Sequence, residues 1–201
     1  MLFYVKRRAS TALLTLLALL LLANAWALLR GIDLGAAFSL DAVAILFALV
    51  GIVFIFSLDG FIYMANWFVG LLPFLRRFDR EMGSLFARVT PGAILAGALL
   101  AALGEESLFR GVLQHEWGLV PAALLFALAH AGRGLRLLAL WAVLQGLIFG
   151  WLYTASGNLL VPMLVHGAHD LFGMVFARYL YGRVVPPAPT LFDWLLALNV
   201  R

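Results

Sequence analysis

The chain has 201 residues, of which 65% are hydrophobic and 12% are charged, and its mean hydropathy is +1.03. An average soluble domain carries about 25% charged residues, so the composition excludes a soluble globular protein and indicates a polytopic membrane protein. The net charge of +4 does not indicate nucleic-acid binding, because Arg and Lys lie at the ends of apolar runs, and the lack of cysteine excludes disulfides, thiolate metal sites and a cysteine nucleophile.

The first predicted element is a membrane span at residues 11–29. This leucine-rich run follows three basic residues at 6–8 and is long enough to cross a bilayer. It is longer than the apolar region of a typical signal peptide, and further apolar residues follow the cleavage-like Ala-Asn-Ala at 23–25. We therefore expect the span to be retained.

A second apolar run extends from Ala36 to Leu58, with Asp41 near its start as an interfacial residue or a helix N-terminal charge. Residues 60–75 are apolar but short, and they contain Asn, Trp and Pro, so they predict either an interfacial segment or a further span. The densest group of arginines, between 76 and 88, follows. The positive-inside tendency places this group in the cytoplasm, and the basic start of the chain favours a cytoplasmic N-terminus.

The remaining elements form a predicted core at residues 91–183. Pro91 suits the first turn of a helix that extends to about Leu113. Further spans are expected at 119–130, 137–153 and 159–181, separated by turns at 114–118, 132–136 and 156–158. A proline-rich stretch and a short apolar tail, 184–201, are expected at the membrane interface, with the C-terminus in the cytoplasm. We predict one all-α domain of about six transmembrane helices plus an interfacial segment, with residues 1–90 as its N-terminal part.

Two neighbouring carboxylates, Glu105 and Glu106, follow the apolar run 93–103 inside one of these spans. An ionised carboxylate in hydrocarbon costs several kcal/mol unless it is paired, solvated or protonated. Glu106 and Arg110 are four residues apart on one helical face, so they can form an internal ion pair. Glu105 points about 100° away and is free to meet another span, which makes it a candidate functional residue.

Two other spans also carry titratable groups at membrane depth. His130 lies near the end of one span and alone suits a helix C-terminal charge, whereas His166 and Asp170 share a face of another, with His169 beside them. Counted from the predicted outer helix ends, Glu105 and His166 lie roughly 12 Å deep and His130 about 17 Å deep. Within boundary errors these groups can meet at a common depth.

Such a group has more than one chemical interpretation. A carboxylate beside an imidazole can take a proton from water and deliver hydroxide to an amide carbonyl. Glu105, His130 and His166 could instead bind a divalent metal such as zinc, although the His-Glu-x-x-His motif is absent. Ser107 lacks the Gly-x-Ser-x-Gly turn of a serine nucleophile. A proton-coupled transporter is the non-enzymatic alternative, although no paired symmetric halves are visible.

At these residues the sequence resembles the CAAX-processing and bacteriocin-immunity (CPBP) family of membrane proteases, which includes the prenyl-protein endopeptidases. The family pattern is Glu-Glu-x-x-x-Arg, Phe-x-x-x-His and His-x-x-x-Asn or Asp, each on its own helix. Here its residues are Glu105, Glu106 and Arg110, then Phe126 and His130, then His166 and Asp170. The resemblance covers Pro91 to about Tyr181.

The resemblance implies that Glu105 activates a water molecule with His130 as its partner, while Glu106 and Arg110 support the site. It also implies that His166 and Asp170 stabilise the oxyanion. The prenyl endopeptidases carry Asn at the position of Asp170; an ionised Asp would oppose an oxyanion unless it is protonated or orients His166. His169 lies outside the pattern and is secondary.

The implied activity is an intramembrane endopeptidase that cleaves a membrane-associated or lipidated protein or peptide near its C-terminus, in contact with membrane lipids. The family has been described both as glutamate-dependent and as metal-dependent, and our expectation is a site without a cofactor. A short chain with basic cytoplasmic loops indicates a bacterial inner membrane. A non-catalytic immunity or scaffold factor that retains the fold is the alternative to an enzyme.

Overall fold

The computed structural model describes residues 2–69, 83, 86–87, 89–131 and 136–179, which contain helices and turns and no strand. The helices are α1 (Leu2–Arg30), α2 (Ala42–Val69), α4 (Pro91–Glu106), the π-helix η1 (Ser107–Gln114), α5 (His115–Trp117), α6 (Leu119–His130), α7 (Arg136–Ser156) and α8 (Leu160–Tyr179). In this part of the chain, five helices are long and apolar enough to cross a membrane, with α4, η1 and α5 counted as one, and α6 is a shorter apolar helix. The predicted all-α membrane bundle is confirmed.

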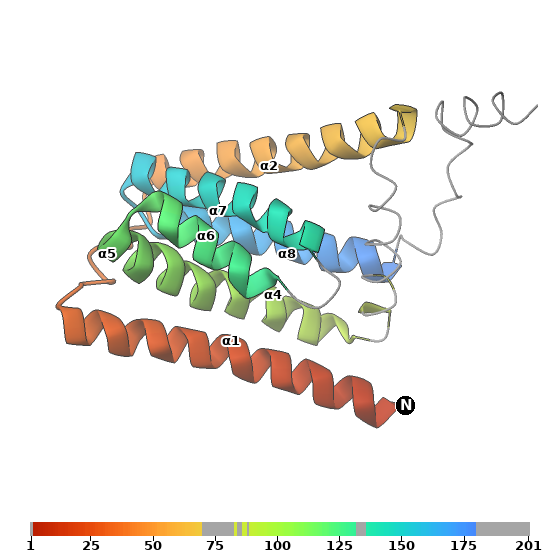
Figure 1. Ribbon diagram of the computed structural model, residues 1–201, viewed down its shortest axis with the longest axis horizontal. Coiled ribbons are helices and arrows are strands. Elements are labelled where there is room, and N and C mark those ends of the chain that lie inside the picture. The colour runs from red at the N-terminus through yellow and green to blue at the C-terminus, as the bar shows by residue number, and fades with distance from the viewer. Residues whose placement is uncertain (1, 70–82, 84–85, 88, 132–135, 180–201) are drawn as a thin grey trace, which may run out of the picture.

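The helix formed by α4, η1 and α5 lies at the centre of the bundle. α1 and α2 lie on opposite sides, with the other helices between them (Figure 1). α4 packs against α1 and α8, η1 packs against α1 and α6, and α2 packs against α8. In α1, 11% of the apolar stretch that could span the membrane is buried inside the protein. In the central helix, 56% of the corresponding stretch is buried. The outer helices therefore present their apolar side chains to lipid, and the central helix faces protein.

α2 differs from the expected second span at both ends. It begins at Ala42 instead of Ala36, because the Asp41 carboxylate accepts a hydrogen bond from the Ala44 N–H (2.8 Å) and caps the helix. The hydrogen bonds from Ala44 and from the Ser39 hydroxyl lower the pKa of Asp41 below its usual value. At its other end α2 continues through residues 60–69, so the expectation of a separate interfacial segment is wrong there, and 70–75 lie outside the described residues. No proline occurs between the start of α2 and Pro73, so no proline interrupts the helix over residues 42–69.

The central helix begins as predicted, since Pro91 occupies its first turn and Thr90 is the N-cap, accepting from the Ala93 N–H at 3.3 Å. The expected turn at 114–118 is too long. Residues 114–117 remain helical, and the chain turns at Gly118, whose φ of 86° suits glycine. Gln114 lies inside the bundle, where its amide donates to the Gly150 carbonyl (2.9 Å).

The later spans agree closely with the sequence. α6 has the predicted bounds, α7 runs from 136 to 156 instead of 137 to 153, and the predicted break at 156–158 contains Gly157 with a φ of 63°. α8 covers residues 160–179 of the span expected at 159–181. Outside the described residues lie residues 132–135 of the predicted turn at 132–136, residues 76–82 of the arginine-rich region and the tail 184–201. Which end of the bundle faces the cytoplasm stays a prediction.

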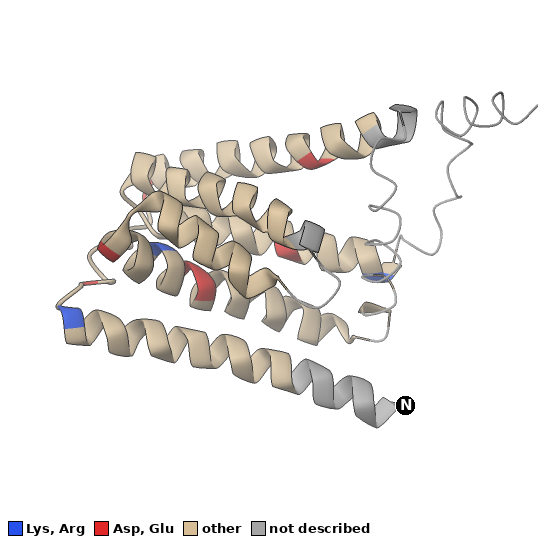
Figure 2. Ribbon diagram, in the orientation of Figure 1, with Lys and Arg blue, Asp and Glu red and all other residues tan. Residues whose placement is uncertain are grey.

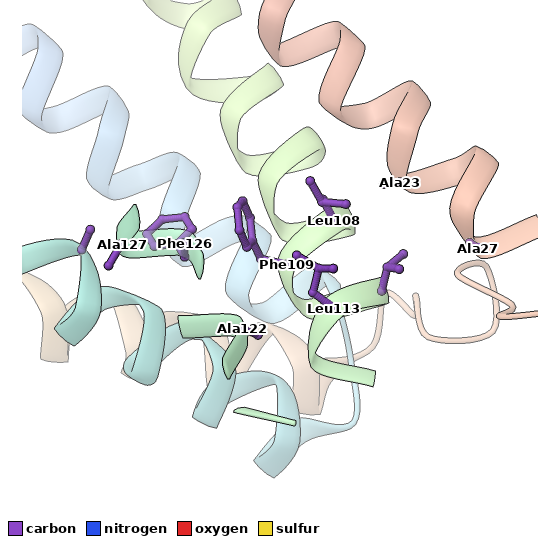
Figure 3. Packing of buried hydrophobic residues seen from close by; sticks show 10 residues of the cluster. Ala23, Ala27, Leu108, Phe109, Leu113, Ala122, Phe126 and Ala127 are labelled. Atoms are coloured by element: carbon purple, nitrogen blue, oxygen red, sulfur yellow. The ribbon is translucent and has the colours of Figure 1, made fainter. Parts of the chain in front are cut away.

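Small residues let the central helix approach its neighbours closely. A cluster of buried apolar residues joins α1, η1 and α6, and Phe109 and Phe126 meet edge to face with centroids 5.1 Å apart (Figure 3). At Gly104, a Cβ atom would lie 2.7 Å from the Leu16 carbonyl oxygen of α1. This contact is with backbone, so a side chain at 104 would push the two helices apart.

We predict that Gly104→Ala lowers the free energy of unfolding by about 1–3 kcal/mol, because the added methyl overpacks the α1–α4 contact. The matched control is Gly92→Ala in the same helix, where a Cβ has no neighbour within 4 Å. Thermal unfolding of the purified protein in detergent measures both. A Gly104→Ala variant as stable as the Gly92→Ala variant would contradict the close approach.

Candidate active site

In the central helix, two acidic residues directly precede a π-helical segment. Most of the helical ribbon is formed by uncharged residues, and a few acidic residues interrupt it (Figure 2). α4 ends with Glu105 and Glu106, and all eight residues of η1, Ser107–Gln114, are buried. π-Helical turns are rare and frequently occur at functional sites. The change of helical pitch therefore falls where the sequence places its charged motif.

Glu106 and Arg110 form the expected ion pair inside the protein. Arg110 Nη1 lies 2.9 Å from Glu106 Oε1, and the two side chains are 1% and 0% exposed. Arg110 Nη2 donates to the Gly146 carbonyl of α7 at 3.2 Å, and the guanidinium lies 4.6 Å from the centre of the Phe126 ring. The arginine thus holds a buried carboxylate, a helix backbone and an aromatic ring together.

His166 of α8 joins this pair from the other side. Its Nδ1 lies 2.7 Å from Glu106 Oε1, and its Nε2 lies 3.5 Å from Asp170 Oδ2, four residues further along α8. The ring stacks on Phe149 of α7 with centroids 5.0 Å apart and is 4% exposed. His166 therefore makes its hydrogen bond to Glu106 and not to Glu105.

Glu105 faces a different neighbour, His130 at the end of α6. Glu105 Oε2 is buried without a hydrogen-bond partner and lies 3.8 Å from His130 Nε2. His130 Nδ1 lies 2.8 Å from the Phe126 carbonyl oxygen, which can only accept, so Nδ1 carries the proton of that bond. In the neutral ring, Nε2 then presents a lone pair towards Glu105. As whole side chains, Glu105 and His130 are more exposed than Glu106, with 11% of Glu105 and 30% of His130 accessible.

The remaining predicted residue, His169, belongs to a second set of contacts that the sequence did not reveal. Its Nε2 lies 3.1 Å from Asp59 Oδ2 of α2, and Gln145 Nε2 of α7 lies 3.1 Å from its Nδ1. Asp59 directly follows Leu58, where the second span was expected to end, and it was not among the predicted site residues. A polar side chain within an apolar run, the signal used for Glu105, identifies both Asp59 and Gln145.

The described part of the chain contains no ready metal site. Among the described residues, no group of three or more His, Asp or Glu side chains is arranged to hold a metal ion. Of the alternative ligands, Glu105, His130 and His166, the last has both ring nitrogens directed at other carboxylates. The donor set proposed from the sequence is therefore divided between two sets of contacts, and a cofactor-free site stays a prediction.

The fold and these contacts define a helical membrane protein with buried carboxylate–imidazole pairs. Residues 87–172 match the model of the family described as type II CAAX prenyl endopeptidase Rce1-like. This match confirms the resemblance of the segment to the CPBP proteases. The match includes every predicted site residue and excludes α1 and α2.

A curated relative matches a similar share of the chain. The uncharacterized protein YpbD of Bacillus subtilis (strain 168) is 38% identical over 98 residues, which are 46% of this chain and 48% of that protein. The chain thus spans about half the length of this relative. No solved structure matches the sequence.

We predict that Arg110→Met lowers the free energy of unfolding by about 3–5 kcal/mol, because it leaves Glu106 with one fewer partner in the interior. The control is Arg30→Met. Arg30 pairs with Glu116 at a similar distance, 2.8 Å, but its side chain is 57% exposed, so its loss has little effect. Thermal unfolding in detergent compares the two variants. If Arg110→Met and Arg30→Met lower the free energy of unfolding equally, burial does not set the strength of the Glu106–Arg110 pair.

Proposed function

We propose that the protein is an intramembrane endopeptidase in which Glu105 activates a water molecule. The observation that supports this most directly is the pair of acceptors, Glu105 Oε2 and His130 Nε2, 3.8 Å apart. This separation exceeds a direct hydrogen bond and matches the span of a single bridging water molecule. A water in that position donates one hydrogen to each acceptor and keeps a lone pair for attack on a carbonyl carbon.

The proposed reaction conserves protons without a covalent enzyme intermediate. Glu105 takes a proton from the water as its oxygen bonds to the peptide carbonyl carbon, which gives a tetrahedral oxyanion. The protonated Glu105 then returns this proton to the amide nitrogen as the carbon–nitrogen bond breaks. The products are a carboxylic acid and an amine. His130 orients the water, and its Nδ1 bond to the Phe126 carbonyl keeps Nε2 facing the site.

His166 is the proposed donor to the oxyanion. Its Nδ1 is engaged by Glu106 at 2.7 Å, whereas its Nε2 is 3.5 Å from Asp170, a long contact that can yield to a substrate oxygen. In this scheme Asp170 orients the His166 ring before the substrate binds, and the substrate oxygen then replaces it at Nε2.

The proposed substrate is a membrane-associated or lipidated protein or peptide, cleaved near its C-terminus. Glu105 lies within a span-length apolar helix, so the scissile bond has to reach the interior of the bundle. A chain end can do so with less unfolding than the middle of a folded domain. The family name of the matched domain refers to prenylated substrates. We place the protein in a bacterial inner membrane with both termini in the cytoplasm.

We predict that Glu105→Gln lowers kcat by roughly 100-fold or more, because an amide cannot accept the proton of water. The control is Glu116→Gln, which makes the same chemical change near the end of the same continuous helix, outside the site. The assay is cleavage of a panel of lipidated and unlipidated membrane-anchored peptides by purified protein in lipid vesicles. Products are identified by mass, which also locates the cleaved bond.

Cleavage by the Glu105→Gln variant at the wild-type rate would remove Glu105 from the mechanism. If the wild-type protein cleaves none of the peptides, the endopeptidase proposal fails for these substrates. A biological activity that then survives both Glu105→Gln and His130→Ala would favour the non-catalytic membrane factor.

Chelation tests the cofactor-free form of the proposal. We expect cleavage to be unchanged after treatment with a strong zinc chelator, and elemental analysis to find no stoichiometric zinc in the active protein. Loss of cleavage on chelation and its recovery with added zinc would instead favour the alternative in which Glu105, His130 and His166 hold a metal.

A further inference from the structure

Asp59 is a carboxylate inside a membrane span with no role in the proposed reaction. It lies on α2, within the apolar window 42–65, and its side chain is 26% exposed. Asp59 also lies outside the matched segment 87–172. A carboxylate at this position is costly unless a partner compensates it, so its contacts indicate what it does.

One face of α2 contacts His169 of α8. Asp59 Oδ2 lies 3.1 Å from His169 Nε2, and the ring of Phe56, three residues earlier in α2, lies 6.3 Å from the imidazole, centre to centre. From α7, Gln145 Nε2 lies 3.1 Å from His169 Nδ1. The imidazole is therefore held by groups from two other helices and is 17% exposed.

His169 in turn contacts Asp170 of the proposed site. His169 Nδ1 lies 3.7 Å from Asp170 Oδ1, a contact between neighbouring groups that is too long for a hydrogen bond, and His166 Nε2 lies 3.5 Å from Asp170 Oδ2. The Asp170 carboxylate thus has an imidazole beside each oxygen. Successive residues of an α-helix point about 100° apart, so His169 stays beside Asp170 only if something outside α8 holds its ring. Asp59 is a charged group of α2 that holds the His169 ring in this way.

We propose that Asp59 is a positioning residue, which acts through His169 to hold Asp170 against His166. Carboxylate and imidazole then alternate from α2 to the centre of the bundle: Asp59, His169, Asp170, His166 and Glu106. This inference rests on the proposed function, since Asp170 and His166 act in that reaction. α2 then contributes a positioning residue to the active site, although the family match begins after α2.

The kinetic test uses Asp59→Asn, with Asp41→Asn as the control that removes a carboxylate from the N-terminus of the same helix. Asp59→Asn lowers kcat roughly tenfold or more and leaves KM within about twofold, because the catalytic groups are displaced while the substrate is still bound. In a His169→Gln background, Asp59→Asn causes no further loss, since its route to Asp170 is already broken. If the losses of kcat in Asp59→Asn and His169→Gln multiply in the double variant, the proposal is overturned. It is also overturned if Asp59→Asn leaves kcat unchanged.

A second measurement does not need activity. The protein has four histidines, and ¹⁵N-labelled imidazoles report on each ring by NMR in detergent. Asp59→Asn shifts the signals of His169 and also of His166, whereas Asp41→Asn shifts neither. A change at His169 alone, or at neither ring, overturns the proposal. If the wild-type protein is inactive, the proposed function fails and these spectra still decide whether Asp59 acts on the site.

Discussion

The structure depends on one buried oxygen atom, Glu106 Oε1. It lies 2.9 Å from Arg110 Nη1 and 2.7 Å from His166 Nδ1, so a single carboxylate oxygen joins α4, η1 and α8. In a bundle with little water, such a charge is stable only while its partners remain in place, and removing either partner is expected to be costly. Because Glu106 takes up these two partners, Glu105 is left to face His130 and the more accessible part of the site.

Much of the fold and most of the site could be predicted from the sequence, because these features depend on short-range spacing. An apolar run with a glycine near each end predicted the bounds of α6, and Pro91 predicted the start of the central helix. The four-residue spacing of Glu106 and Arg110 predicted a contact within a single helical turn. Polar residues on three separate spans indicated one shared site, since isolated charges are unfavourable in hydrocarbon.

The features that the sequence did not predict depend on contacts between helices or on local geometry without a residue signature. No propensity distinguishes the π-helix 107–114 from an α-helix, and Gln114 was assigned to a turn although α7 supplies it with buried partners. The Asp59–His169 pair joins residues 110 positions apart, so spacing alone could not reveal it. The attachment of His166 to Glu106 instead of Glu105 also depends on how α8 packs against α4.

If Glu105 and His130 act on the same water molecule, their contributions to catalysis cannot be independent. The most direct measurement is a double-mutant cycle on kcat with Glu105→Gln, His130→Ala and the double variant, using a peptide that the wild-type protein cleaves. Residues that act as a unit show strongly non-additive losses, so the double variant should be about as slow as the slower single variant. Losses that multiply would mean that the two residues act separately, and would contradict a shared water.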